Sequence, residues 1–192
     1  LDALVAGFDQ YLGQVDGPKV LCLDDPTCAE LAVAHGAITY GIEHTVRNNE
    51  AAPQFEARSV RQVSGGVGFD VALLGVRLGT VSLPLRGHHN VRNALAVVAM
   101  AHSIGIPFAT TAGALQKFGG VARRFDLRGI DAGATFVDDY AHLPTEVAAV
   151  ITAACEGGWD RVVAVFQPHR YSRVRDLFDD FCTCFSEADL VV

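Results

Sequence analysis

Apolar side chains recur at two spacings along the chain, which separates predicted helices from predicted strands. In the first fifteen residues Leu4, Phe8 and Leu12 recur at every fourth position, as on one face of a helix. A short apolar run follows, and after it come Asp25 and Pro26, a pair typical of a helix start. Two strands joined through a helix lie parallel, so a β-α-β unit is expected. The predicted helices are 1–15 and 24–35, and the predicted strands are 19–23 and 37–40.

Between residues 55 and 85 apolar and polar positions alternate with a period of two, which indicates strands. Three such runs are joined by glycine-containing turns, and this arrangement predicts an antiparallel meander. Two Ala-rich segments with helical character follow and end at glycines. Asn90, at the beginning of the first of them, is predicted to be its N-cap. The strands are expected at 55–63, 68–74 and 76–85, and the helices at 90–104 and 110–118.

Near residues 121–125 the pattern restarts, so two domains are expected, 1–124 and 125–192. The second is α/β, with strands and helices in alternation. The strand that ends near Val137 and the strand that ends at Phe166 are separated by one helix, which predicts neighbours in a parallel sheet. Strands are expected at 127–130, 134–137, 161–166 and 190–192, and helices at 144–154 and 174–185.

Composition places limits on the class of protein. The 192 residues are 50% hydrophobic with a mean hydropathy of +0.25, enough for one large or two small domains. The net charge is −7, which argues against nucleic acid or an anionic membrane as a partner. No apolar run approaches the ~20 residues of a membrane span, and no signal peptide is visible. The sequence therefore predicts a cytoplasmic protein.

Five cysteines are present, and none forms a C-x-x-C pair. Cys182 and Cys184 stand two apart in a helical pattern, where their side chains diverge. Free thiols in a reducing compartment are expected, rather than a zinc site or a disulfide.

The segment FQPHRYSR concentrates cations at the predicted end of a buried strand. In open α/β sheets ligands bind at this edge, and the planar fork of arginine binds carboxylate or phosphate through two hydrogen bonds. His169, Arg170 and Arg173 therefore indicate an anion-binding loop. The alternative is a pair of solvated arginines near a helix start.

A second polar loop follows the neighbouring strand. Asp138 and Asp139 repel each other unless a sugar hydroxyl, an arginine or a metal is near. If both loops leave the same sheet edge, one cleft would hold Tyr140, His142, His169, Arg170 and Arg173. The alternative for this segment is local, because Thr145 or Glu146 can serve the N-terminus of the next helix.

Two further groups complete the candidates. Asn90 and Asn93 lie three apart on one helix face, and their carboxamides suit an adenine edge; a plain N-cap is the alternative. Arg123 and Arg124 bring two cations to the predicted domain boundary.

Four motifs carry a family resemblance. HNVRNALAVVAMA resembles the H-N-x-x-N helix of the Mur ligases. FGGVARRF, VDDYAHLPTEV and VFQPHRYSR, in this order, resemble the branch of that family which joins L-alanine to UDP-N-acetylmuramate in peptidoglycan synthesis. The resemblance covers essentially the whole chain. It implies part of the central ATP-binding domain, a mixed sheet with helices, in 1–124, and part of a Rossmann-like C-terminal domain in 125–192.

The resemblance also implies cofactors and a partial enzyme. ATP and Mg²⁺ are expected, with no metal ligands in this chain, because the G-x-x-G-K-[ST] loop is absent from the sequence. The chain by itself is expected to be inactive. Two other functions remain open: a sister ligase that recycles murein peptides, and a non-catalytic module that binds a nucleotide or UDP-sugar.

Residue roles follow from the same resemblance. His89, Asn90 and Asn93 are expected on the adenine side of ATP, Arg124 at its phosphates or ribose, and Asp139 at the ribose hydroxyls. The pocket for L-alanine and the muramoyl group is expected to comprise Tyr140, His142, His169, Arg170 and Arg173. Four of these are the catalytic candidates: His142 or His169 as the base, and Arg170 or Arg173 at the alanine carboxylate. Leu143 stands where many relatives have a second histidine.

Overall fold

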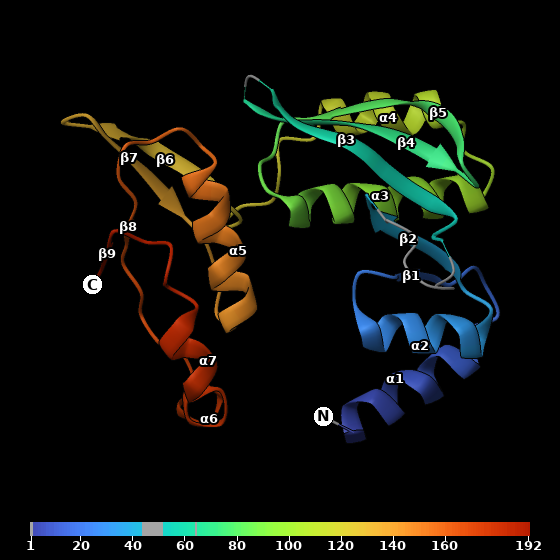
Figure 1. The fold of residues 1–192 in the computed structure, drawn as a ribbon, viewed down its shortest axis with the longest axis horizontal. Helices are drawn as coiled ribbons and strands as arrows, with labels where there is room; N and C mark the ends of the chain where they lie inside the picture. The colour runs from blue at the N-terminus through green and yellow to red at the C-terminus, as the bar shows by residue number, and fades with distance from the viewer. Residues whose placement is uncertain (1, 44–51, 64) are drawn as a thin grey trace. The chain divides into compact units, whose positions relative to one another are not determined.

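The computed structural model describes residues 2–43, 52–63 and 65–192, which form two compact units (Figure 1). Unit 1 comprises Leu1–Leu85 and His89–Phe118, and unit 2 comprises Arg86–His88 and Gly119–Val192.

Unit 1 contains a five-stranded sheet in the order β1-β2-β3-β4-β5. The first three strands run parallel and the last three antiparallel, so the sheet is mixed. The predicted β-α-β unit and the predicted meander are both confirmed. The strands are β1 (Val20–Cys22), β2 (Ile38–Ile42), β3 (Phe55–Val63), β4 (Gly66–Leu73) and β5 (Val76–Leu83).

Four helices accompany this sheet: α1 (Asp2–Gln14), α2 (Pro26–His35), α3 (His88–Ser103) and α4 (Phe108–Gln116). Asp25 caps α2 as predicted, since its carboxylate accepts the N–H of Cys28 at 2.8 Å. The prediction that Asn90 is an N-cap is wrong, because α3 begins two residues earlier, at His88. Gly87, with φ +85°, already turns the chain before it.

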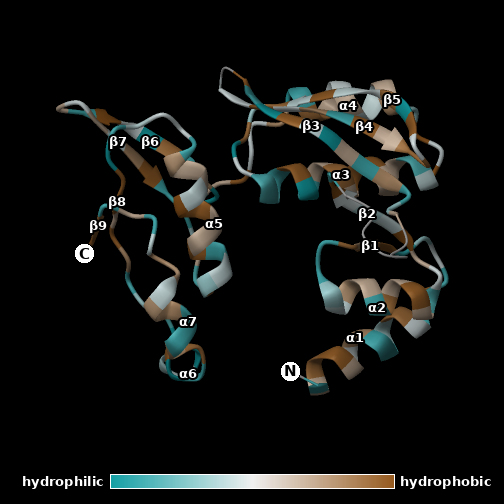
Figure 2. Cartoon of the chain, in the orientation of Figure 1, coloured by the Kyte–Doolittle hydropathy of each residue, from teal (hydrophilic) through white to brown (hydrophobic). Residues whose placement is uncertain are grey.

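The core of unit 1 lies between α3 and the sheet. Val71 and Val81 of the sheet and Leu95 and Val98 of α3 are fully or almost fully buried in one cluster. In Figure 2 the first turns of α3 are hydrophilic and most of the remaining turns are hydrophobic. The core holds α3 from Val91 onward, and the polar side chains beside Val91 in the first turns are available for other contacts.

Unit 2 contains two separate two-stranded sheets, β6-β7 and β8-β9. Its strands are β6 (Asp126–Asp131), β7 (Ala134–Asp138), β8 (Val163–Ala164) and β9 (Leu190–Val191). Its helices are α5 (Pro144–Cys155), α6 (Tyr171–Asp176) and α7 (Phe178–Thr183). After β7 strands and helices alternate as predicted, except that the single helix expected at 174–185 is two short helices, α6 and α7, which meet at Leu177.

The predicted pairing of the two strands on either side of α5 is wrong. Over the described residues β7 pairs with β6 in an antiparallel hairpin, and β8 pairs with β9 in parallel. The hairpin follows from a two-residue turn, Ala132 and Gly133, which brings β6 back beside β7. The hairpin occupies one edge of β7, and among the described residues the other edge carries no ladder, whereas β8 pairs with β9 across a crossover that contains α6 and α7.

Candidate functional site

The first turns of α3 present the polar residues predicted for adenine. Asn90 Nδ2 lies 3.1 Å from His89 Nε2, and Asn93 is exposed three positions further along the helix. Arg92, between them, donates from Nε to Asp24 Oδ2 at 2.7 Å. This ion pair ties α3 to the loop after β1, and so it holds the helix that carries the two asparagines.

The loop after β7 is organised by Asp139. Its Oδ2 accepts the N–H of Phe125 at 2.7 Å, and its Oδ1 accepts the N–H of Ala141 at 2.7 Å. Phe125 has φ +48°, a backbone conformation that is uncommon outside glycine, so it needs support of this kind. Each carboxylate oxygen keeps a second lone pair, and the proposed ribose contact remains chemically possible. Asp138 is exposed.

His142 is held in a defined tautomer. Its Nδ1 lies 2.8 Å from the carbonyl oxygen of Tyr140. A carbonyl only accepts, so Nδ1 carries the hydrogen, and in the neutral ring Nε2 is the proton acceptor. The rings of Tyr140 and His142 lie 5.1 Å apart. The structure therefore brings two predicted substrate residues together and gives one of them a free basic nitrogen.

Glu146 is a member of this cluster whose role there the sequence did not reveal. Its Oε2 accepts the N–H groups of His142 at 3.0 Å and Leu143 at 3.2 Å. Its Oε1 lies 3.5 Å from Nη1 of Arg124. The spacing from Leu143 to Glu146 indicates helix capping, and that part was predicted as an alternative. Its contact with Arg124, 22 positions away, has no signal in the sequence.

Glu146 is ionised at neutral pH. Partial burial opposes the charged form, but the two N–H groups of His142 and Leu143, the imidazole of His142 and the guanidinium of Arg124 outweigh it. The pKa of Glu146 is accordingly lower than that of an ordinary glutamate.

The arginine-rich loop stands at the start of α6. His169 and Arg170 are exposed, and Arg173 donates from Nη1 to the carbonyl oxygen of His169 at 3.3 Å. Arg170 has φ +69°, an uncommon conformation for a residue with a side chain. The loop is thus shaped by its own contacts, and its convergence with Tyr140 and His142 stays a prediction.

Metal-ligand clusters and membrane-spanning helices are both absent from residues 2–43, 52–63 and 65–192. In these ranges no three histidine, cysteine or acidic side chains gather where they could hold a metal ion. Within the same ranges no helix is both long and apolar enough to cross a bilayer. The cysteines described by the structure are free thiols.

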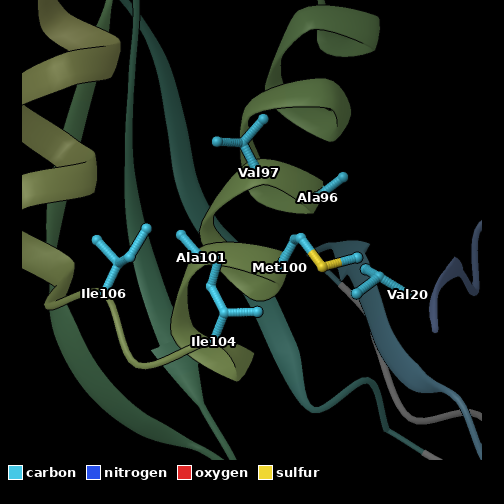
Figure 3. A pocket seen from close by; sticks show the side chains of 7 residues that line it. All are labelled: Val20, Ala96, Val97, Met100, Ala101, Ile104 and Ile106. Atoms are coloured by element: carbon cyan, nitrogen blue, oxygen red, sulfur yellow. The ribbon is translucent and has the colours of Figure 1, made fainter. Parts of the chain in front are cut away.

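Unit 1 also has an apolar groove between β1 and the second half of α3 (Figure 3). It offers no charged group that could bind a phosphate or an amino acid, so it is separate in character from the polar clusters. Its lining residues are Val20, Ala96, Val97, Met100, Ala101, Ile104 and Ile106.

Two family models match the chain. The model of the Mur ligase middle domain matches residues 12–101, and that of the Mur ligase glutamate ligase domain matches residues 123–192. The chain belongs to the Mur ligase family. The predicted fold class, part of a Mur ligase central domain followed by part of the C-terminal domain, is therefore confirmed.

Curated Mur ligases resemble the chain along its whole length. A UDP-N-acetylmuramate–L-alanine ligase of Salinibacter ruber is 44% identical over 197 residues, covering 100% of this chain and 40% of the relative. The ligase of the same name from Paracoccus denitrificans is 44% identical over 201 residues, covering 99% of this chain and 42% of the relative. The chain thus spans about two fifths of the length of these relatives.

Solved structures agree with this placement. A UDP-N-acetylmuramate–alanine ligase from Thermotoga maritima matches with a TM-score of 0.77 at 28% identity, covering 97% of this chain and 39% of that one. MurF from Acinetobacter baumannii also reaches a TM-score of 0.77, at 18% identity, covering 99% of this chain and 42% of that one. The second likeness shows the shared Mur ligase fold alone.

Proposed function

We propose that the chain is part of an ATP-dependent ligase that forms an amide between L-alanine and the carboxylate of UDP-N-acetylmuramate. The observation that carries this proposal is the 44% identity, along the whole chain, to relatives named for that reaction. In this proposal residues 1–124 belong to the central ATP-binding domain and residues 125–192 to the C-terminal ligand-binding domain. The protein acts in the cytoplasm, where its nucleotide substrates are made.

The proposed roles divide into a nucleotide set and an acceptor set. His89, Asn90 and Asn93 contact adenine, because the turns of α3 that carry them are polar and anchored through Arg92. Arg124 contacts the phosphates or ribose of ATP, and Asp139 the ribose. The acceptor set binds L-alanine and the muramoyl end of the sugar nucleotide, and it comprises Tyr140, His142, His169, Arg170 and Arg173.

The chemistry is amide formation through an acyl phosphate. ATP phosphorylates the carboxylate, the alanine amine attacks the acyl carbon, and the tetrahedral intermediate expels phosphate. Arg170 or Arg173 holds the alanine carboxylate through charge-assisted hydrogen bonds. Most of the gain comes from alignment, since good positioning can supply ~7 kcal/mol or more of a barrier.

The attacking amine must lose a proton, and His142 is the better candidate base. Its Nδ1 is engaged by the Tyr140 carbonyl, which leaves Nε2 as the proton acceptor. Mg²⁺ would neutralise the phosphates of bound ATP, but the described residues supply no cluster of ligands for it.

The test is alanine-dependent release of ADP in the presence of UDP-N-acetylmuramate. A polypeptide of the relatives' length that includes this chain should show it, and the 192-residue chain alone should not. Replacing L-alanine by a murein tripeptide distinguishes the recycling ligases. Turnover with the tripeptide but not with alanine, or nucleotide binding with no turnover at all, would overturn the proposal.

A further inference from the structure

One carboxylate in unit 2 joins two groups that have separate proposed roles. Glu146 Oε1 faces Nη1 of Arg124, the proposed nucleotide contact, at 3.5 Å. Its Oε2 accepts the N–H groups of His142 and Leu143 and lies 3.5 Å from His142 Nδ1. Both carboxylate oxygens of Glu146 are therefore engaged, Oε1 with Arg124 and Oε2 with His142 and Leu143.

The surroundings of Glu146 favour a fixed arrangement. The side chains of Glu146 and His142 are partly buried, at 29% and 26% exposed, and that of Arg124 is 49% exposed, so the carboxylate and the imidazole are better shielded from solvent than the guanidinium. The two N–H bonds hold Oε2 at the N-terminus of α5, because both donors belong to consecutive backbone positions there. Oε1 is then the carboxylate oxygen left to face Arg124.

We propose that Glu146 is a positioning residue that places Arg124 and the His142 loop in one arrangement, so that the nucleotide contact and the candidate base are set by the same side chain. This inference rests on the proposed function, which supplies the roles of Arg124 as a nucleotide contact and of His142 as the candidate base. Its structural part, a carboxylate shared by the two, stands without it.

A simple helix cap is the competing explanation, and Glu146→Gln separates the two. The glutamine oxygen can still accept both backbone N–H groups in the place of Oε2. Its amide NH₂ then faces Arg124 and cannot accept from the guanidinium. Capping is retained while the Arg124 contact is lost, whereas Glu146→Ala loses both.

Glu187→Gln is the matched control. Glu187 also bonds to α5, since its Oε2 accepts from Oγ1 of Thr152 at 2.6 Å. Like Glu146→Gln, the Glu187→Gln substitution removes one carboxylate that contacts α5 in unit 2. Glu187 contacts none of the proposed site residues.

The structural part is tested on the 192-residue chain by NMR. Amide hydrogen exchange at His142 and Leu143 should stay slow in Glu146→Gln and in the control and become fast in Glu146→Ala. The Arg124 side-chain Nε–H resonance should shift in both Glu146 variants and not in the control. An Arg124 resonance that is unmoved by Glu146→Gln would overturn the shared role and leave the cap alone. If the alanine variant does not fold, the glutamine variant still decides this point.

The functional part is tested in a polypeptide of the relatives' length that contains the chain. The loss of a half-exposed ion pair lowers affinity by up to about fivefold. Glu146→Gln should therefore raise KM for ATP by about two- to fivefold and leave KM for L-alanine unchanged. Glu146→Ala should raise both KM values and lower kcat. The double variant with Arg124→Gln should be no worse than Arg124→Gln alone.

The outcomes separate the two proposals. If Arg124→Gln itself leaves KM for ATP unchanged, the proposed nucleotide role of Arg124 fails, whatever Glu146 does. If Arg124→Gln raises KM and Glu146→Gln behaves like Glu187→Gln, the positioning role of Glu146 fails and the proposed function stands.

Discussion

At the scale of single residues, the loop after β7 is held by two carboxylates with different partners. Asp139 joins Phe125 to Ala141 through backbone N–H groups. Glu146 joins Arg124 to His142 and Leu143. Segments on both sides of the β6-β7 hairpin are thus tied to one short loop, which accounts for the defined orientation of His142.

Asp139→Asn should destabilise the protein, because an amide can replace only one of the two carboxylate acceptors. One backbone N–H would then face an NH₂ group, at an expected cost of about 1–3 kcal/mol in the free energy of unfolding. Urea unfolding measures this. The neighbouring Asp138→Asn is the control, since Asp138 is exposed, and equal effects at both positions would contradict the assignment.

The lowered pKa of Glu146 predicts a dependence of stability on pH. A carboxylate whose pKa is depressed by folding stabilises the protein above its unfolded pKa of about 4.3, and this contribution disappears as pH falls through the folded pKa. The difference in unfolding free energy between the wild type and Glu146→Gln should therefore be largest near about pH 7 and shrink below about pH 4. Denaturant curves over that range test the sign. A difference that grows on acidification would contradict it.

At the scale of elements, two hairpins have the same type of two-residue turn. In both, the first turn residue has a positive φ although its side chain disfavours that conformation. Leu74 and Gly75 join β4 to β5 with φ values of +48° and +83°. Ala132 and Gly133 join β6 to β7 with φ values of +46° and +82°. Positive φ at both central positions is the type I′ turn, in which Asn-Gly is the preferred pair.

Leu74→Asn and Ala132→Asn should each raise the free energy of unfolding, by up to about 1 kcal/mol, because asparagine tolerates the left-handed conformation. Leu74 is 72% exposed, so the loss of its side chain costs little burial. Thermal unfolding of the two single variants and the double variant measures the gain. Replacement of Leu74 and Ala132 by valine, which is stiff at χ1, is the opposite control and should lower stability.

At the scale of the whole molecule, the pattern of burial on α3 determines which substitutions unit 1 tolerates. Val97 and Val98 are adjacent in sequence, but Val97 is 48% exposed in the apolar groove and Val98 is 1% exposed in the core. Identical changes at the two positions therefore isolate burial from helix propensity.

Val98→Ala should lower the free energy of unfolding by about 2 kcal/mol, since it removes buried carbon atoms and leaves a cavity. Val97→Ala should change it by less than about 0.5 kcal/mol, because alanine also favours the helix. Chemical denaturation followed by circular dichroism gives both values. Similar losses would show that the groove is as well packed as the core.

Much of the fold could be predicted from the sequence, because the spacing of apolar residues and the residues that begin and end helices are local features of the chain. The spacing of four residues between Leu4, Phe8 and Leu12 predicted α1 correctly, and Asp25 with Pro26 predicted the start of α2. The start of α3 was placed two residues late, since a strong capping residue inside the first turn resembles a true N-cap. Most candidate site residues came from polar side chains at the predicted ends of strands and starts of helices, and their individual roles came from the motif resemblance.

The sequence by itself determined the family, the order of helices and strands apart from the division of the last helix into α6 and α7, and the side chains available for chemistry, because these depend on neighbours in the chain. Only the tertiary structure decided which distant groups meet. Asp24 and Arg92 are 68 positions apart, and Arg124 and Glu146 are 22 apart, yet each pair shares one contact. Strand pairing in unit 2 was also decided there, in favour of β6 with β7. Such contacts depend on how whole elements pack, and no spacing along the chain encodes them.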